Sequence, residues 1–231
     1  YQAGTLVFFA PGQVSEFEIP APAYQPKGFG LVFHPDLVHG TSLGKAIAQY
    51  HFFSYQSNEA LHISDAERQI VLDSFTKIAF ELSQSIDKHS KKLITSNIEL
   101  FLSYCERFYD RQFISREHVN KGIAARFESL LNDYFISEKA QQQGLPSVAY
   151  FAEALHLSPN YFGDLMKKET GHSVKEIIQN KLIDVAKDRI YDGHKSINEI
   201  AYELGFKYPQ HFTRLFKQQV GNTPLQYRNL N

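Results

Sequence analysis

Residues 196–221 read SINEIAYELGFKYPQHFTRLFKQQVG, and residues 147–171 carry the same pattern as SVAYFAEALHLSPNYFGDLMKKETG. Leu155 in the first copy aligns with Leu204 in the second at an offset of 49 residues, and the positions after the turn align at an offset of 50. One extra residue in the second turn accounts for the change. An internal repeat of this kind indicates that one supersecondary unit occurs twice.

Each copy has the local signals of a helix, a sharp turn and a second helix. Apolar residues at helical spacing mark the first helix of each copy: Val148, Phe151, Ala152 and Leu155, then Ile197, Ile200, Ala201 and Leu204. Gly205 suits the turn because glycine tolerates a positive φ angle. The first helix of each copy starts at a serine, Ser147 or Ser196, that can cap free backbone N–H groups. Ser158-Pro159 predicts an N-cap followed by proline at the first helical position. Gly171 and Gly221 are placed to end the second helices, so each copy predicts a helix-turn-helix unit.

The segment between the copies predicts one long helix around residues 173–191. Its apolar stripe consists of Val174, Ile178, Leu182, Val185 and Ile190. Such a helix would hold the two units rigidly apart. Residues 147–231 are therefore expected to form an all-α domain of two helix-turn-helix units joined by a long helix.

In these motifs the sequence resembles the AraC/XylS family of bacterial transcription regulators. The second copy carries IAYELGF at residues 200–206, HFTRLFK at 211–217 and GNTPLQYR at 221–228, and the first carries LSPNYF at 157–162 and KKETG at 167–171. The resemblance covers the repeat and implies a double-stranded DNA-binding domain. It also implies a regulator that responds to a small-molecule effector, whose identity the sequence leaves unknown, and possible contact with RNA polymerase.

The resemblance further implies which side chains meet DNA, since an α-helix fits the major groove and its N-terminal residues reach base edges. The first recognition helix would present Asn160, Gly163 and Asp164, and the second Pro209, Gln210, His211, Thr213 and Arg214. Arg214 can contact guanine at two points and Gln210 adenine. Lys207, which precedes the second helix, is expected to meet phosphate at most. Gly163 has no side chain and Asp164 is anionic, so the first helix is expected to contribute shape and backbone contacts more than base reading.

Composition and charge bound the class of protein only weakly. The chain has 231 residues, 43% hydrophobic and 21% charged, and a formal net charge of −1. Residues 146–231 hold 11 Lys+Arg against 9 Asp+Glu, whereas the rest of the chain has an acidic excess. Lys167, Lys168, Lys195 and Lys217 are further candidates for phosphate contacts. Cys105 is the single cysteine, so an intramolecular disulfide is excluded, and with no membrane-spanning run or signal peptide a cytoplasmic location is expected.

The first 63 residues predict a β-rich region and give the whole chain the class α+β. Thr5–Phe9, Phe29–Phe33 and Tyr50–Tyr55 are aromatic and β-branched runs, and Pro11-Gly12 and Pro20-Ala-Pro22 are turn signals. Phe9–Gln13 is similar to the strand and Pro-Gly turn of the cupin-like barrel that the family often carries. We expect a partial barrel, truncated at its N-terminus because the chain opens on Tyr1 in a strand-like pattern. A pocket for the effector, or its vestige, would be lined by residues such as Phe8, Phe33 and Tyr50.

Residues 64–136 predict long amphipathic helices that form a dimerisation region. Three apolar faces begin at Val71, Ile94 and Val119 and continue at helical spacing. These faces are either core or, for one or two of them between residues 90 and 135, also a homodimer interface. The polar segment 137–146, with its glutamine run, is interpreted as a linker to the domain at 147–231.

Two other classes of function compete with a DNA-binding regulator. His34, His39, His51 and His62 raise the possibility of a cupin-type metal enzyme, but their spacing favours surface or core histidines over ligands. The sequence lacks a nucleophile elbow, a phosphate-binding loop and a dinucleotide signature, so a non-enzyme without metal or cofactor is expected. The other alternative is a protein-interaction module with a vestigial DNA-binding domain.

Overall fold

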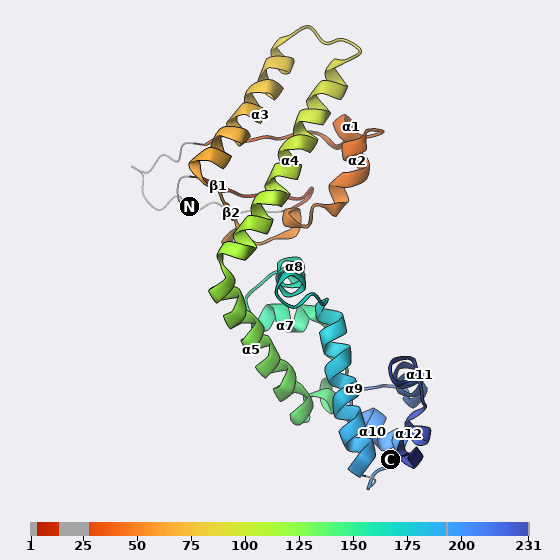
Figure 1. Cartoon of the computed structure of the whole chain (residues 1–231). Helices are drawn as coiled ribbons and strands as arrows, with labels where there is room; N and C mark the ends of the chain where they lie inside the picture. Colours follow the sequence, from red (N-terminus) through yellow and green to blue (C-terminus); the bar gives the residue numbers. More distant parts are fainter. Residues whose placement is uncertain (1–3, 14–27, 193, 231) are drawn as a thin grey trace. The chain divides into compact units, whose positions relative to one another are not determined.

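The computed structural model describes residues 4–13, 28–192 and 194–230, and its contacts divide the chain into two compact units, Tyr1–Ser115 and Arg116–Asn231 (Figure 1). Helices dominate the described part of both units. The elements of unit 1 are β1 (Thr5–Leu6), α1 (Pro35–Val38), α2 (Ser42–Ala46), the 3-10 turns η1 (Ile47–Gln49), η2 (His51–Ser54) and η3 (Ser57–Glu59), β2 (Leu61–His62), α3 (Asp65–Ser83) and α4 (Ser90–Ser115). Strands β1 and β2 pair antiparallel, with Thr5 opposite His62.

Helices α3 and α4 form the hairpin on which the rest of unit 1 packs, and local signals fix where each helix begins. Ser64 caps α3 in a capping box with Glu67, whose carboxylate accepts the Ser64 backbone N–H at 2.8 Å. Before α4, the carboxylate of Asp87 accepts the backbone N–H groups of His89 and Ser90. These bonds satisfy donors that a helix N-terminus otherwise leaves free.

The core of unit 1 is a cluster of aromatic rings on one face of α4. Phe8 lies 4.5 Å from Phe52, centroid to centroid, and also meets Phe101 and Tyr109 of α4. Cys105 is fully buried, and this burial raises the pKa of its thiol, as expected of a small core residue. Phe8 and Tyr50 are therefore core side chains packed against other rings.

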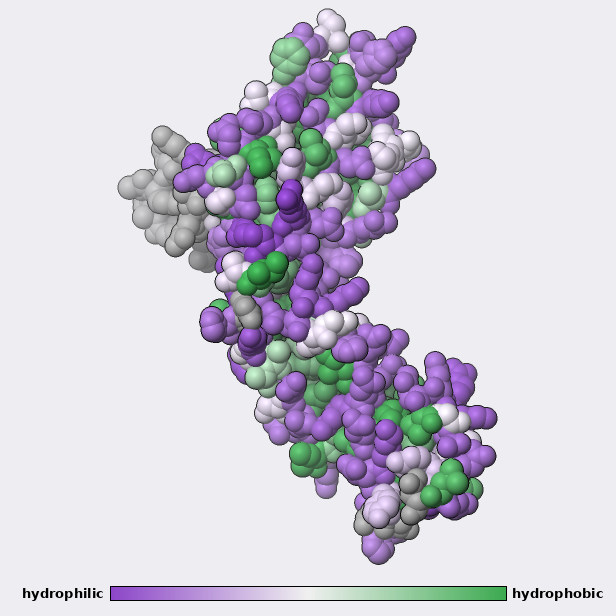
Figure 2. Space-filling model, in the orientation of Figure 1, coloured by the Kyte–Doolittle hydropathy of each residue, from purple (hydrophilic) through white to green (hydrophobic). Residues whose placement is uncertain are grey.

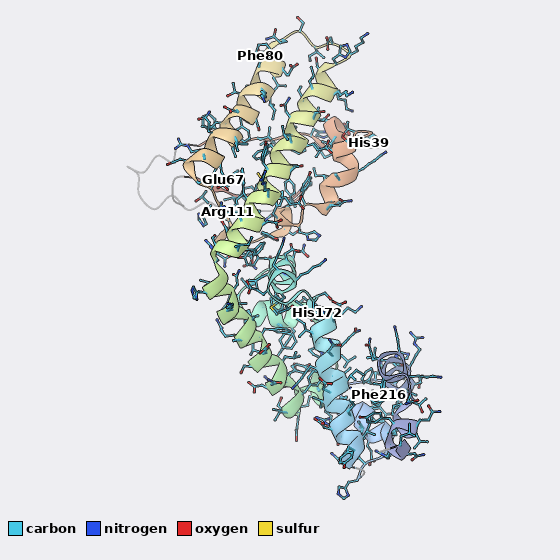
Figure 3. The ribbon with its side chains drawn as sticks, in the orientation of Figure 1. His39, Glu67, Phe80, Arg111, His172 and Phe216 are labelled. Atoms are coloured by element: carbon cyan, nitrogen blue, oxygen red, sulfur yellow. The ribbon has the colours of Figure 1, made fainter. Side chains whose placement is uncertain are left out.

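Side chains near the end of α4 hold the segment that leads into β2. The buried Gln112 accepts the His62 backbone N–H at 2.8 Å and donates to the Ala60 carbonyl at 3.1 Å. Arg111 donates to the His62 carbonyl at 2.7 Å and to both carboxylate oxygens of Glu67 (Figure 3). Burial alone would raise the pKa of Glu67, but hydrogen bonds from Ser64 and Arg111 hold it below the usual value. Arg111 and Gln112 of α4 thus make the hydrogen bonds to the backbone of Ala60 and His62 that a further strand beside β2 would otherwise make.

The prediction of a β-rich, cupin-like barrel is wrong for the residues that the structure describes. Only Thr5–Leu6 of the first predicted strand is extended in a ladder, Phe29–Phe33 lies in neither a helix nor a strand, and Tyr50–Tyr55 contains a 3-10 turn. Phe52 and Tyr55 are buried three residues apart, which suits a 3-10 turn and not an alternating strand. The predicted turn at Pro11-Gly12 is present, and the one at residues 20–22 lies outside the described residues.

All regular elements in the described residues of unit 2 are helices: α5 (Glu117–Ile136), α6 (Lys139–Gln143), α7 (Val148–Ala154), α8 (Pro159–Thr170), α9 (Val174–Asp192), α10 (Ile197–Glu203), α11 (Pro209–Val220) and α12 (Pro224–Leu230). This arrangement confirms the predicted all-α domain. Helix α5 also belongs to this unit, because Phe127 is fully buried between Phe151 of α7 and Phe162 of α8. The segment predicted as a linker contains α6 and packs within the same unit.

Removing the Gln112 amide is expected to destabilise unit 1. Gln112→Met keeps the volume of the side chain but takes the partner away from the His62 N–H and the Ala60 carbonyl. Lost partners of this kind cost roughly 1–3 kcal/mol each, so we expect a loss of about 2–4 kcal/mol in urea unfolding. Gln69→Met, the same change at an exposed glutamine of α3, should stay within about 0.5 kcal/mol of the wild type. Equal effects of the two substitutions would contradict this account.

Candidate nucleic-acid interface

The first helix-turn-helix unit consists of α7 and α8, and capping serines start both helices. The Ser147 hydroxyl accepts the Tyr150 N–H at 3.1 Å, and the Ser158 hydroxyl accepts the Tyr161 N–H at 3.2 Å. His156 in the turn has a φ angle of 58°, a left-handed conformation that non-glycine residues rarely adopt. Gly171 ends α8 at a φ angle of 74°.

The second unit consists of α10 and α11 and repeats this design. Ser196 forms a capping box with Glu199, and the hydrogen bonds from the Ser196 side chain and backbone lower the pKa of that exposed carboxyl. Gly205 occupies the turn at a φ angle of 90°, in the position that His156 occupies in the first unit. Pro209 begins α11, and Gly221 ends it at a φ angle of 89°. The predicted caps, turns and helix-ending glycines are thereby confirmed.

Aromatic contacts fix the rotation of each recognition helix about its own axis. In α11, Phe212 and Phe216 are fully buried with ring centroids 5.7 Å apart, and Phe206 and Tyr227 extend the cluster. In α8, Phe162 and Leu165 are fully buried. Tyr161 and Met166 of α8 are buried as well. Because these residues turn inward, the opposite face of each helix turns toward solvent. Figure 1 shows α8 and α11 both nearly end on, so their axes are roughly aligned.

The structure places the predicted contact residues on the outward faces to different degrees. Gln210, His211 and Arg214 of α11 are exposed, as are Lys207 before the helix and Asn160 of α8. Pro209, Thr213, Gly163 and Asp164 are half-buried. Nothing lies within 4 Å of the position that a Cβ atom would take at Gly163, so α8 presents open space there.

The sequence reasoning missed Tyr208, which organises the side chains at the start of α11. The Lys207 ammonium lies 5.7 Å above the centroid of the Tyr208 ring, within the range of a cation–π interaction. The same ring meets the His211 ring edge to face at 5.6 Å. The only signal in the sequence is the adjacency of Lys207, Tyr208 and Pro209, and it does not indicate where the ring points.

The described residues contain neither a cluster of metal-ligating side chains nor a membrane-spanning helix. Among them no group of three or more His, Cys, Asp or Glu side chains is placed to hold a metal ion. His34 and His39 flank α1, and His62 contacts the Thr5 hydroxyl at 3.2 Å. In the described ranges, no helix is both long and apolar enough to cross a membrane.

Comparisons with known proteins match this geometry. A family model described as a helix-turn-helix domain matches residues 151–230. The uncharacterized HTH-type transcriptional regulator YfiF of Bacillus subtilis is 31% identical over 141 residues, which cover 61% of this chain and 41% of YfiF. YobQ, of the same description and organism, is 28% identical over 51% of this chain and 54% of its own length. The chain thus spans about half the length of these relatives.

Among solved structures, the C-terminal domain of AraT, a response regulator from Geobacillus stearothermophilus, is similar at 25% identity. The match covers 47% of this chain and 85% of that domain, with a TM-score of 0.42.

Two capped helix pairs with outward-facing recognition helices define a helix-turn-helix protein. Residues 151–230 thus form a helix-turn-helix domain of the AraC type, and the chain is similar there to proteins named HTH-type transcriptional regulators.

A glycine pair tests the local geometry of the two units. A Cβ at Gly205 would lie 2.6 Å from the Ala140 carbonyl oxygen, and its φ angle is positive. The left-handed conformation costs roughly 1–2 kcal/mol and overpacking roughly 1–3 kcal/mol, so Gly205→Ala should lose about 2–5 kcal/mol in urea unfolding. Gly163→Ala, inside α8 with open space around it, should instead gain up to about 1 kcal/mol. A neutral Gly205→Ala variant would refute this description of the turn.

Proposed function

We propose that this protein is a sequence-specific double-stranded DNA-binding transcription regulator that places α8 and α11 in the major groove. The observation that carries the proposal is the outward face of α11, where Gln210, His211 and Arg214 are exposed. The opposite face of the helix is fixed by the fully buried rings of Phe212 and Phe216. Selection from a random duplex DNA library tests it. Enrichment of a defined sequence is the expected result, and recovery of no enriched sequence would refute the proposal.

The second unit is proposed to carry most of the base reading. A guanidinium such as that of Arg214 can bond guanine O6 and N7 together, and the Gln210 amide can bond adenine at two points. Thr213 and His211 offer single hydrogen bonds, and Pro209 offers an apolar surface for a thymine methyl group. Lys207, held near the Tyr208 ring, is proposed to meet a phosphate beside the groove.

The first unit is proposed to contribute position more than sequence. Gly163 leaves room for the DNA backbone to approach, and Asn160 is exposed near the start of α8. Asp164 can accept a hydrogen bond from cytosine N4 but is repelled by phosphate. Binding energy from this unit would therefore depend less on the base sequence than that of the second unit, while Asn160 and Asp164 still give α8 a preferred half-site.

The properties of the whole protein rest on the family resemblance. A response to a small-molecule effector through the N-terminal region, contact with RNA polymerase, a cytoplasmic location and the absence of enzymatic activity stay predictions. The relatives named HTH-type transcriptional regulators support the regulatory class.

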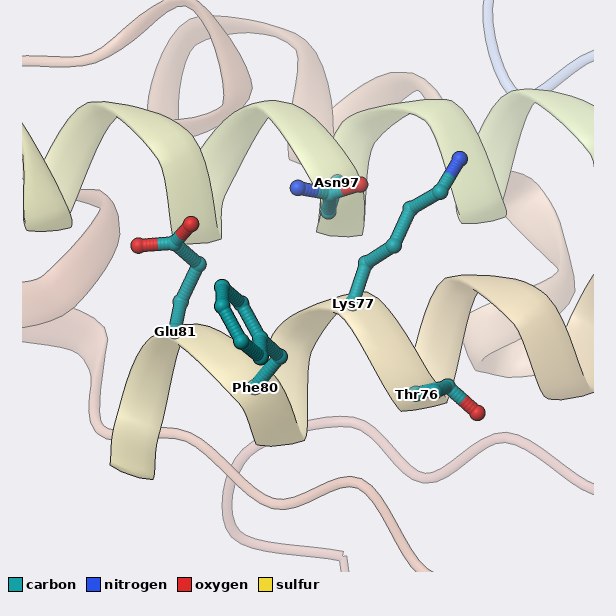
Figure 4. A pocket seen from close by; sticks show the side chains of 5 residues that line it. All are labelled: Thr76, Lys77, Phe80, Glu81 and Asn97. Carbon is teal, nitrogen blue, oxygen red and sulfur yellow. The ribbon is translucent and has the colours of Figure 1, made fainter. Parts of the chain in front are cut away.

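A homodimer is proposed to form through α3 and α4. The sequence predicted the interface between residues 90 and 135, so the proposal keeps α4, drops α5 and adds α3. The apolar face of α5 is already used, because Phe127, Leu131 and Tyr134 are buried in unit 2. On α4, by contrast, Leu93 and Leu100 are exposed on either side of Asn97. Phe80 of α3, 61% exposed, lies opposite Asn97 in a shallow groove (Figure 4). On the face that Figure 2 shows, such hydrophobic residues form separate patches among hydrophilic ones.

A charge placed on this face should separate the dimer. Leu100→Glu would bury a carboxylate against apolar partners, so we expect a monomer by light scattering at micromolar concentration where the wild type is a dimer. Leu225→Glu, at an exposed leucine of α12, is the matched control and should leave the wild-type mass unchanged. A monomeric wild type would rule out this part of the proposal.

Replacing Arg214 and replacing Lys207 should change DNA binding in different ways. Arg214→Ala should cost about 1–3 kcal/mol at one base pair and flatten the preference there. Lys207→Ala should weaken every sequence alike and lower the slope of log K against log salt by about one. Titrations of single-base variants of the selected site at two salt concentrations separate the two effects. If Arg214→Ala weakens all variants equally, the proposed placement of α11 in the groove is incorrect.

A further inference from the structure

The two helix-turn-helix units of unit 2 are connected by more than the long helix α9. The second connection is the α5–α6 corner, residues 134–144, where the chain leaves α5 and passes through α6. Helix α5 packs on the first unit through Phe127, and α6 packs on α10 of the second unit. The corner therefore contacts both helix-turn-helix units. The two units are joined to each other twice, once through α9 and once through the corner.

At the second unit, the corner meets the turn backbone to backbone. A Cβ at Gly205 would lie 2.6 Å from the Ala140 carbonyl oxygen and 2.6 Å from the Gly144 carbonyl carbon. Gly144 itself has a φ angle of 87°, and its N–H bonds the Ala140 carbonyl at 2.9 Å. The approach of α6 to the turn thus leaves no room for a side chain at Gly205, and Gly144 supplies the positive φ angle that the corner needs.

At the first unit, Tyr134 fastens the corner. Its ring is buried and lies edge to face with Tyr150 and Phe151 of α7, at 5.1 Å and 6.1 Å. Its hydroxyl donates to the Gly144 carbonyl at 3.0 Å. One side chain therefore joins the core of the first unit to the residue that touches the turn of the second.

Arg189 of α9 makes a parallel link. It donates to the Phe135 carbonyl at 2.8 Å, one of the carbonyls that the end of α5 leaves without a helical partner. Its other terminal nitrogen lies 3.6 Å from the Glu203 carboxylate at the end of α10, which also binds Lys195 at 2.5 Å. The guanidinium fork thus spans from α5 to the second unit.

We propose that the α5–α6 corner is a brace that fixes the second helix-turn-helix unit relative to the first, with Tyr134 and Arg189 as its positioning residues. The brace sets the separation of α8 and α11. Through this separation it sets the spacing that the protein accepts between two DNA half-sites, which are the major-groove segments that α8 and α11 occupy. The second statement rests on the proposed function, whereas the first concerns the free protein alone.

Spin-label distances test the brace without DNA. Labels on cysteines introduced at the exposed Lys167 of α8 and Gln218 of α11 report the separation of the recognition helices in the full chain; the native Cys105 is buried. We expect the distance distribution to broaden in Tyr134→Phe/Arg189→Met. The control Tyr150→Phe/Lys187→Met removes a hydroxyl of the same ring cluster and a cation of the same helix, and it should keep the wild-type width. An unchanged distribution in the brace variant overturns the inference.

Half-site spacing tests the consequence for binding. Starting from the selected DNA site, one base pair is added or removed between the half-sites, which turns one recognition helix away from its groove. The wild type and the control should lose about tenfold in affinity, equivalent to about 1.4 kcal/mol. In the brace variant the separation of α8 and α11 can adjust, so its affinity should fall clearly less when the spacing is changed. The same variant should bind the original site more weakly than the wild type does. A spacing profile that matches the wild type overturns the link to half-site choice.

The two measurements distinguish failure of the inference from failure of the proposed function. If the wild type enriches no DNA sequence, the proposed function and the half-site statement both fall. The spin-label distances still decide the brace in that case. If DNA is bound and the distances do not change, the proposed function stands and the brace is wrong.

Discussion

The packing of α5 on the first helix-turn-helix unit is the contact on which the rest of unit 2 depends. Helices α7 and α10 each have seven residues, and isolated helices shorter than about 12 residues are marginal in water, so packing has to hold them. For α7, Phe127 supplies this packing by meeting Phe151 of α7 and Phe162 of α8 edge to face at 5.1 Å each. Without α5, the first unit would expose the rings that position α8.

Local signals in the sequence were enough to predict the two helix-turn-helix units. They did not predict that α5 and α6 pack on these units. The repeat, the capping serines and Gly205 each depend on a few neighbouring residues, and the structure has them where they were predicted. The partner of α5 could not be predicted, because an amphipathic stripe shows that a face is buried and not against which surface. The contact of Gly205 with Ala140 is long-range and leaves no pattern in the sequence.

The same limit explains the error in the N-terminal region. Runs such as Tyr50–Tyr55 combine aromatic residues that favour strands, but aromatic rings also fill a core when they sit on turns beside a long helix. Phe52 stacks on Tyr109 of α4 at 5.5 Å, and Gln112 satisfies the backbone that a neighbouring strand would otherwise bond. For Tyr50–Tyr55, composition indicated burial correctly and the kind of element wrongly, whereas Phe29 and Val32 of another run are exposed.

The proposed interface assigns different roles to the two units. The first unit carries the larger aromatic core, to which α5 adds Phe127 and Tyr134, and its recognition helix offers Gly163 and the half-buried Asp164. The second unit has helices of the same lengths and exposes Gln210 and Arg214. A unit that is held firmly but carries few reading side chains suits an anchor on the DNA backbone, since phosphate contacts position a protein without reading sequence. A reader placed by such an anchor is effective only if its position is fixed, because a base contact requires correct hydrogen-bond geometry. In the proposed arrangement, the close backbone contact at Gly205 would meet that requirement. The contact also explains why the turn of the second unit carries glycine at the position that His156 occupies in the first unit.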